Sequence, residues 1–355
     1  MDRITAACPS RQKIYTYINE GKHTVAVEGS FEIVPLSHDA WHHWSRILDC
    51  ILLGTGGMMP MPHRLLTSLA VRLSGQIYVF DAGEGTQLGW KRVRLGLRGL
   101  RVLAVTHLHA DHCLGIPGLL MLRAQMEDPE PLTIIGPPGI AAFLQEAQKA
   151  LGFYINYPIT FIEWSGDEGN PLYQDEQVRI ISHSLKHTRF CLGYRLEELE
   201  RPGKFDASRA ARLRIPRGPL WGKLQRGEKI VLESGREIRP NAVLGPSRRG
   251  RHLAYVVDTR PTKAIYNLCR DVDIAFMEGM FLAKDAEHAD AKGHLTVAEA
   301  ANLARRAGVR QAVLVHISPR YGDEDLVSLE DEAQGIFDQA VVGRDLAIYS
   351  VPHGE

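Results

Sequence analysis

The feature that most clearly suggests chemistry is a run of metal-binding side chains at residues 106–112, Thr-His-Leu-His-Ala-Asp-His, directly after an apolar run. Side chains two residues apart at a strand end point to the same face, so His107 and His109 converge. Asp111 and His112 lie in the turn that follows and are expected to face the same point. Four ligands within six residues predict two adjacent metal sites. Imidazole and carboxylate suit zinc, with manganese and iron as alternatives, and burying such a cluster without a metal would be costly.

Three further candidate ligands follow other apolar runs: His187, Asp258 and His316. Each is ambiguous alone, because an aspartate after a strand is often a cap and a histidine there is often a core residue. Asp81 ends a fourth run, and we expect it to orient a ligating histidine from behind.

The elements that must position these residues follow a mixed α/β pattern. Nine short apolar runs bounded by turn formers predict strands: ILDCILL, SLAVRL, IYVFD, RVLAVTH, LTIIG, VRIISH, LAYVVD, DIAFME and QAVLVH. Three- and four-residue spacing predicts helices over 137–151, 261–269, 296–307 and 326–339. Strands that first meander and then alternate with helices predict two sheets with helices outside.

The chain divides at the first strong strand. Residues 1–46 are interpreted as an N-terminal extension of unknown role, and 47–355 as one catalytic domain. The string SHDAWHHW, residues 37–44, is not expected to bind metal. The segment LLGTGG, residues 52–57, predicts a tight turn at a strand end rather than a phosphate loop, because no Lys-Ser/Thr follows it.

Composition excludes several classes of protein. The 355 residues are 45% hydrophobic and 24% charged, which excludes wholesale disorder. Five scattered cysteines without a CxxC pair predict neither a disulfide framework nor a zinc knuckle and fit a reducing cytosol. No leader-like segment and no run of about 18 apolar residues is found. We therefore expect a soluble cytoplasmic protein with no membrane partner.

Charge is sorted along the chain although basic and acidic residues balance at 42 each. Between residues 201 and 226 only Asp206 opposes eight basic residues, and Pro-Gly and Gly-Pro steps mark residues 196–228 as a flexible arm. Such a segment suits a polyanion. The basic residues of the arm, the candidate substrate contacts, are Arg201, Lys204, Arg209, Arg212, Arg214, Arg217, Lys223 and Arg226.

The ordered set of candidate residues resembles the metallo-β-lactamase superfamily, and more narrowly the ribonuclease Z family of endonucleases that trim tRNA 3′ ends. The similarity runs from about residue 52 to about residue 321. Its motifs are LLGTGG, FDAGEGTQ (80–87), THLHADHCLGIPGLL (106–120), IGPPG (135–139), HTRFCLGYRLEE (187–198), the arm (202–228), DTRP (258–261), GHLT (293–296) and HIS (316–318).

The resemblance implies a four-layer αββα sandwich with a protruding basic arm. It implies two zinc ions per subunit, one held by His107, His109 and His187, the other by Asp111, His112 and His316, with Asp258 bridging. It implies that Asp111 also accepts a proton from water, and that Glu278 and His294 protonate the leaving oxygen. The substrate would be precursor tRNA, cut to leave a 3′-hydroxyl, and the enzyme a homodimer whose arms hold tRNA.

The sequence departs from the family pattern in three strings. The family's HEAT reads MEGM at 277–280, GHST reads GHLT, and PxKxRN retains only Pro60 and Arg64, with Pro62 and Leu65 at the Lys and Asn places. The sequence therefore leaves open the cleavage position and whether CCA-bearing precursors are cut.

Two other functions stay open at this point. One is a different dinuclear phosphodiesterase or arylsulfatase of the same fold, acting on small esters, which would not need the basic arm. The other is a non-catalytic RNA-binding module, which would not need a full ligand set. Metal content together with phosphodiesterase turnover distinguishes the module from an enzyme.

Overall fold

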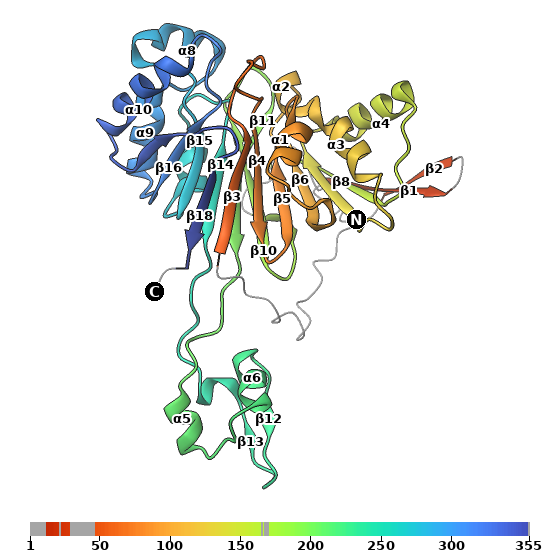
Figure 1. Ribbon diagram of the computed structural model, residues 1–355, viewed down its shortest axis with the longest axis vertical. Helices are drawn as coiled ribbons and strands as arrows, with labels where there is room; N and C mark the ends of the chain where they lie inside the picture. The colour runs from red at the N-terminus through yellow and green to blue at the C-terminus, as the bar shows by residue number, and fades with distance from the viewer. Residues whose placement is uncertain (1–11, 21–22, 29–46, 165, 167–169, 354–355) are drawn as a thin grey trace, which may run out of the picture.

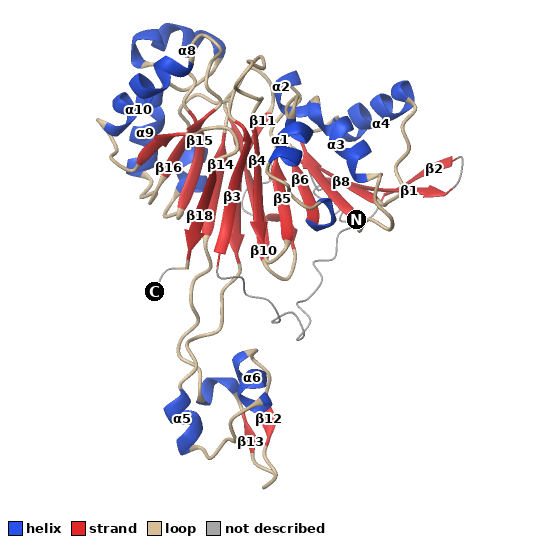
Figure 2. Cartoon of the chain, viewed as in Figure 1, coloured by secondary structure: helices blue, strands red, loops and turns tan. Residues whose placement is uncertain are grey.

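Four layers, helices–sheet–sheet–helices, make up the body of the protein in the computed structural model, as predicted (Figures 1 and 2). The structure describes residues 12–20, 23–28, 47–164, 166 and 170–353. A small arm projects below the body. None of the helices within these ranges is long and apolar enough to cross a membrane.

The first sheet has nine strands in the order β18-β3-β4-β5-β6-β7-β8-β1-β2. The strands β5 to β8 run parallel, and the other neighbours pair antiparallel. Their bounds are β1 Gln12–Glu20, β2 His23–Glu28, β3 Ile47–Gly54, β4 Ser68–Leu73, β5 Gln76–Phe80, β6 Leu100–Ala104, β7 Leu132–Gly136, β8 Ile159–Trp164 and β18 Ile348–Pro352.

The second sheet has seven strands in the order β17-β16-β15-β14-β11-β10-β9. The strands β14 to β17 run parallel, so their carboxyl ends share one edge. The bounds are β9 Pro171–Gln174, β10 Val178–Leu185, β11 Cys191–Glu198, β14 His252–Val256, β15 Ile274–Glu278, β16 Ala312–Val315 and β17 Ala340–Val342. All nine predicted strands are present.

Helices cover the outer faces of both sheets. The first sheet is covered by α1 Thr86–Arg92, α3 Gly115–Arg123 and α4 Ile140–Leu151, and the second by α7 Lys263–Cys269, α9 Val297–Arg306 and α10 Leu326–Gln334. Two short helices, α2 Ala110–Cys113 and α8 Ala286–Lys292, lie at the upper edge of the sheets in Figure 1. Single 3-10 turns occupy Leu97–Gly99, Pro240–Ala242, Ala283–Asp285 and Asp323–Asp325.

The four predicted helices form, with shifted ends. The helix α9 starts after the N-cap Thr296, whose side chain accepts the Glu299 N–H in a capping box. The predicted helix 326–339 ends at Gln334, before Gly335. The sequence did not predict α1, because Gly89 interrupts its pattern; a Cβ there would lie 2.5 Å from the Leu53 carbonyl oxygen, so close packing requires the glycine.

Aromatic residues of the core between the two sheets extend to the edge where several strands end. The ring centroid of Phe80 lies 5.8 Å from that of Tyr194 and 5.6 Å from that of Tyr255. The Tyr194 hydroxyl donates to the Val105 carbonyl at 2.6 Å, and the Tyr255 hydroxyl donates to Asp81 at 3.1 Å. Packing of the sheets thereby fixes the backbone and side chains where the strands end.

The arm is longer and more ordered than predicted. The predicted range 196–228 begins inside β11 and covers only the first half of an excursion that returns to the body at β14. The arm contains α5 Ala207–Arg212, α6 Pro219–Gln225 and a hairpin of β12 Ile230–Val231 and β13 Glu237–Ile238. Its own core consists of Ala210, Ile215, Leu224, Ile230, Ile238 and Val243. These segments are too short to show periodicity in the sequence.

The described part of residues 1–46 does not stand apart from the domain. Strand β1 pairs antiparallel with β8, and β2 extends the sheet beyond β1. This differs from the predicted boundary at residue 46, because backbone pairing at an open sheet edge leaves little trace in sequence. The string 37–44 lies outside the described residues.

A buried ion pair closes the base of the arm. Arg251 contacts both oxygens of Glu198, at 2.7 and 2.8 Å, and donates to the Val351 carbonyl at 3.0 Å. The Arg251 and Glu198 side chains are 2% and 1% exposed. The pair thus joins the last residue of β11, the residue before β14 and the C-terminal strand.

We expect Arg251→Met to lower the free energy of unfolding by about 3–5 kcal/mol, because it leaves the buried Glu198 carboxylate without its guanidinium partner. Urea unfolding of the full chain measures this. The double variant Glu198→Gln/Arg251→Met should recover part of the loss, and a loss below about 1 kcal/mol for the single variant would contradict a buried, paired role.

Candidate metal centre

The predicted ligands meet at the edge where strands of both sheets end. Asp81 follows β5, His107 follows β6, Asp258 follows β14 and His316 follows β16. Asp81, Asp258 and His316 have φ of 57°, 56° and 57°. This left-handed region is costly for residues other than glycine, and such strain is concentrated at functional sites.

The short helix α2 supplies two more ligands. Its N-cap is His109, and Asp111 and His112 lie in its single turn, as predicted for the turn after the strand. The helix sits against the β5–α1 connection, where the Ala82 N–H donates to the His112 carbonyl at 2.9 Å. A Cβ at Gly83 would lie 2.3 Å from the Asp111 carbonyl oxygen, so this approach requires glycine.

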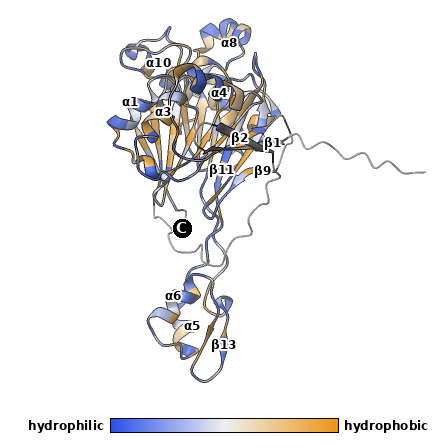
Figure 3. Cartoon of the chain, turned by 90° about the vertical axis from the view of Figure 1, so that its right-hand side faces the viewer, coloured by the Kyte–Doolittle hydropathy of each residue, from blue (hydrophilic) through white to orange (hydrophobic). Residues whose placement is uncertain are grey.

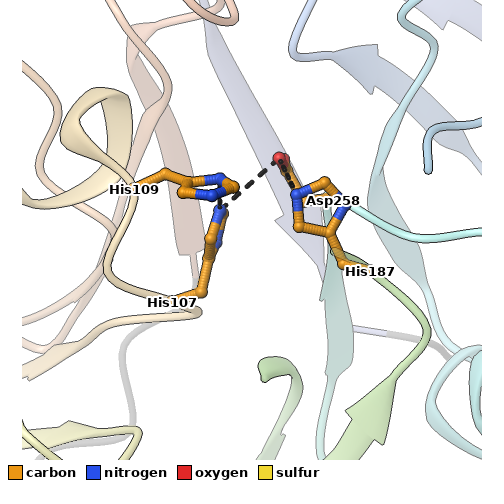
Figure 4. Close-up of side chains that lie close together, drawn as sticks. All are labelled: His107, His109, His187 and Asp258. Carbon is orange, nitrogen blue, oxygen red and sulfur yellow. Dashed lines mark hydrogen bonds and ion pairs between the residues drawn. The ribbon is translucent and has the colours of Figure 1, made fainter. Parts of the chain in front are cut away.

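One group of potential ligands comprises His107, His109, His187 and Asp258 (Figure 4). His107 Nε2 lies 2.8 Å from His109 Nδ1 and 3.6 Å from Asp258 Oδ2. His187 Nε2, from the turn after β10, lies 3.5 Å from the same oxygen. The structure therefore brings together the three histidines that the resemblance assigns to one metal.

The second group comprises Asp111, His112 and His316. His316 Nε2 lies 3.2 Å from His112 Nε2 and 3.3 Å from Asp111 Oδ2. The other oxygen of Asp258, Oδ1, is 3.3 Å from His112 Nε2 and 3.2 Å from His316 Nε2. Asp258 thus turns one carboxylate oxygen toward each group.

The donor set fits a pair of divalent cations. Ligand atoms about 2.1 Å from a zinc ion in a tetrahedron are about 3.4 Å apart, and most of the spacings above are close to this value. Buried Asp258 Oδ1 and His187 Nε2 have no hydrogen-bond partner within the described part of the chain. Cations between the two groups would satisfy both atoms.

Burial and neighbouring charges hold three of these groups in the form that binds metal. Burial, aided by the charge of His112, holds the pKa of His107 well below its ordinary value, and burial also lowers that of His109. For Asp258, burial opposes ionisation, but His316 and His112 outweigh it and hold the pKa well below the usual range. Neutral imidazoles and an ionised carboxylate are the forms that bind metal. His112 differs, because burial lowers its pKa but the charges of Asp258 and Asp81 outweigh burial and raise that pKa well above its ordinary value.

Residues behind the ligands fix their orientation. Asp81, as predicted, contacts a histidine ligand: its Oδ2 is 2.8 Å from His112 Nδ1, and its Oδ1 accepts the Thr106 N–H at 2.7 Å. His187 Nδ1 lies 3.0 Å from the Gly293 carbonyl oxygen, leaving Nε2 to face the cluster. Such contacts set tautomer and ring orientation.

The Glu278–His294 pair that the resemblance implies is formed, and it lies close to the ligands. Glu278 ends β15, is fully buried and accepts the Thr259 N–H, while its Oε2 is 2.9 Å from His294 Nδ1. Burial alone would lower the pKa of His294, but the charge and hydrogen bond of Glu278 raise it above its ordinary value. His294 lies two residues before the N-cap of α9, and its Nδ1 is 3.9 Å from Asp258 Oδ2.

A cavity of about 300 Å³ opens onto the cluster. Its lining residues include His109, Asp111, His187, Asp258, His294 and His316. Met58 also lines it, and the Met58 N–H donates to Asp111 Oδ2 at 2.7 Å. The ligands are therefore accessible to a substrate from one side.

Most of the predicted arm contacts are available at the surface, with two exceptions. Lys204, Arg209, Arg212, Arg214, Arg217 and Lys223 are exposed. Arg226 is half-buried and pairs with Glu228 at 2.7 Å. Arg201 is 5% exposed and lies at the base, where its backbone N–H donates to the Arg248 carbonyl, so little of its side chain is available for a substrate contact.

Several groups that support the site were not predicted from the sequence. Thr106 and Tyr255 both donate to Asp81, and Gly57 lies under His316, where a Cβ would be 2.7 Å from the ring. Thr106 directly precedes the predicted ligand His107, and Tyr255 lies in the strand that precedes the predicted ligand Asp258. The position of each residue near a ligand in the sequence was therefore the available signal. Nothing in the sequence brings Met58 to Asp111.

We expect Asp81→Asn to weaken metal affinity about 10- to 100-fold, because it keeps the side chain's shape but removes the charge behind His112. Titration of metal into the metal-free protein measures the change. Tyr255→Phe removes one hydrogen bond to Asp81 and serves as the control with the smaller expected effect. Equal affinities for wild type and Asp81→Asn would contradict the orienting role.

Comparison with known proteins places this site in a family. The model "Metallo-beta-lactamase superfamily" matches residues 64–123, and "Beta-lactamase superfamily domain" matches 233–317. The chain is 42% identical to Ribonuclease Z of Treponema denticola over 84% of this chain and 96% of the relative, and 37% identical to that of Methanosarcina mazei over 86% and 99%. The crystal structure of human tRNase Z, short form, matches with a TM-score of 0.60 at 20% identity, covering 86% of this chain and 99% of that one. The chain belongs to the ribonuclease Z family of the metallo-β-lactamase superfamily.

Proposed function

We propose that this protein is a metal-dependent endoribonuclease that removes the 3′ trailer from precursor tRNA and leaves a 3′-hydroxyl. The observation that carries the proposal is the placement of Asp258, with one oxygen toward each of two imidazole groups. Family membership supports the choice of substrate. The full set of seven ligands opposes the non-catalytic alternative, and the basic arm opposes a small-ester substrate.

Seven residues would hold two zinc ions per subunit, with manganese or iron as alternatives: His107, His109, Asp111, His112, His187, Asp258 and His316. Such a pair of cations lowers the pKa of water and offsets the charge that develops on the attacked phosphodiester. Asp111 lines the cavity and would accept the proton of the attacking water.

His294 would donate the proton that the leaving ribose oxygen needs. It lines the cavity, and Glu278 behind it favours the protonated ring. A buried carboxylate that orients a histidine and stabilises its charged form is an established arrangement for general acid–base catalysis. Glu278 acts through His294 and is a positioning residue.

We expect His294→Ala to lower kcat on a precursor tRNA by about 10² to 10⁴. Release of p-nitrophenolate from bis(p-nitrophenyl) phosphate needs little protonation and should change far less. Because His294 lies close to Asp258, metal content is measured on the same preparations. Loss of a metal, or equal loss on both substrates, would overturn the proton-donor assignment. Glu278→Gln is the companion variant, and it should also lower kcat more on precursor tRNA than on the small diester, by a smaller factor.

The arm would grip tRNA away from the scissile bond. In Figure 1 it leaves the edge of the sheets opposite the edge that carries the ligands, since β11 enters it and β14 leaves it. RNA held on one arm is therefore well placed for the cluster of a second copy. We propose a homodimer in which each arm serves the partner's site.

Excising the arm tests this role. Gly203 and Gly245 approach closely, since a Cβ on Gly203 would lie 2.0 Å from the Gly245 carbonyl oxygen, so joining them deletes residues 204–244 with little strain. We expect kcat/KM for cleavage of precursor tRNA to fall at least about tenfold, while hydrolysis of bis(p-nitrophenyl) phosphate is retained. Each lost phosphate contact weakens the binding of RNA but not that of a small diester. Matched losses on both substrates would indicate that the arm builds the site.

We also place the enzyme in the cytoplasm. Cys50, Cys113, Cys191 and Cys269 are buried and unpaired, which suits a reducing compartment. The fifth cysteine, Cys8, lies outside the described residues.

A further inference from the structure

One cationic side chain at the cavity has no role in the reaction described so far. Lys292 is the last residue of α8 and lines the same cavity as the ligands. Among the described residues around this cavity it is the one Lys or Arg. It is exposed, whereas the neighbouring His294 is 5% exposed.

Lys292 differs from nearby cations in having no carboxylate partner within the described ranges. Within these ranges its Nζ has one hydrogen-bond acceptor, the thioether sulfur of Met58 at 3.9 Å. A thioether sulfur is a weak acceptor. Arg260, by contrast, contacts Glu299 at 2.8 Å and Asp290 at 3.2 Å. An ammonium with three donors and no strong acceptor is available for an anionic ligand.

The position of Lys292 separates it from the phosphate being cleaved. The reacting phosphate must lie at the buried ligands, at the base of the cavity. Met58 extends from the base of the cavity to its rim. Its N–H donates to Asp111, its side chain contacts Lys292, and the residue is 42% exposed. Lys292 therefore stands at the rim of the cavity, away from its buried base.

We propose that Lys292 binds a phosphate next to the scissile one and so makes the cavity selective for a polynucleotide over an isolated diester. Lysine suits this task, because its ammonium is a compact charge that pairs with phosphate without a fixed orientation. The inference rests on the proposed nuclease function. It assigns to the body of the enzyme an RNA contact that is independent of the arm.

The test compares Lys292→Gln, Lys292→Arg and the control Lys284→Gln, an exposed lysine in the turn Ala283–Asp285. A hydrogen bond to a charged group contributes roughly one to two powers of ten, so Lys292→Gln should lower kcat/KM on RNA about 10- to 100-fold. Lys292→Arg should recover most of the activity, and Lys284→Gln should match wild type. Hydrolysis of bis(p-nitrophenyl) phosphate, which has no second phosphate, should stay unchanged in all three.

Neutral linkages locate the contact. RNA substrates carry a single methylphosphonate one linkage to the 5′ or the 3′ side of the cleaved bond. At one of these two positions the methylphosphonate should lower the cleavage rate of the wild type. It should not lower the rate of Lys292→Gln any further, because that variant already lacks the contact. Independent losses at both positions, no loss of RNA cleavage by Lys292→Gln, or an equal loss on the small diester would each overturn the proposal.

A binding measurement separates this inference from the nuclease function. RNA whose leaving oxygen is replaced by a methylene group cannot be cleaved, and its affinity is measured over a range of salt concentrations. Loss of one phosphate contact should reduce the slope of log Kd against log salt by about 0.7 for single-stranded RNA. If wild type cleaves no RNA, the proposed function fails, whereas an unchanged slope for Lys292→Gln contradicts the lysine's role alone.

Discussion

The carboxylate of Asp258 is the contact on which the rest of the site depends, because it lies between the two groups of potential ligands and turns one oxygen toward each. Its two oxygens lie 3.2 to 3.6 Å from four histidine nitrogens, in a place where the side chain is 2% exposed. A buried carboxylate is costly unless it is paired. The histidines pair with it, and cations in the same space would satisfy the atoms that remain without partners.

This arrangement requires strand ends from both sheets to meet at one edge. The parallel strands β5 and β6 bring Asp81 and His107 there, and β14 and β16 bring Asp258 and His316. The aromatic core between the sheets holds the two halves in register through the hydroxyls of Tyr194 and Tyr255. Left-handed φ values at Asp81, Asp258 and His316 cost stability, and the packed core sustains them.

Much of the site could be predicted because its residues follow strands that the sequence shows clearly. His107, Asp258 and His316 each come directly after a run of buried residues, and parallel strands place such positions together. The proximity of His294 to Asp258 could not be predicted, because it depends on the conformation of the turn between α8 and α9. The second half of the arm and the β1–β8 pairing also escaped prediction, since two-residue strands and edge pairing leave no periodic pattern.

Strand β14 connects the two functional parts of the molecule. Arg251, immediately before it, is locked to Glu198 at the base of the arm, while Asp258, just after it, bridges the ligand groups. Seven residues at about 3.3 Å each put roughly 23 Å between these positions along one buried strand. This separation puts the base of the arm and the cluster at opposite ends of the strand. Under the proposed function, RNA bound by an arm would therefore have to extend past the sheets to reach the cluster of its own chain or enter the site of another copy, and the second route would need no change in the fold.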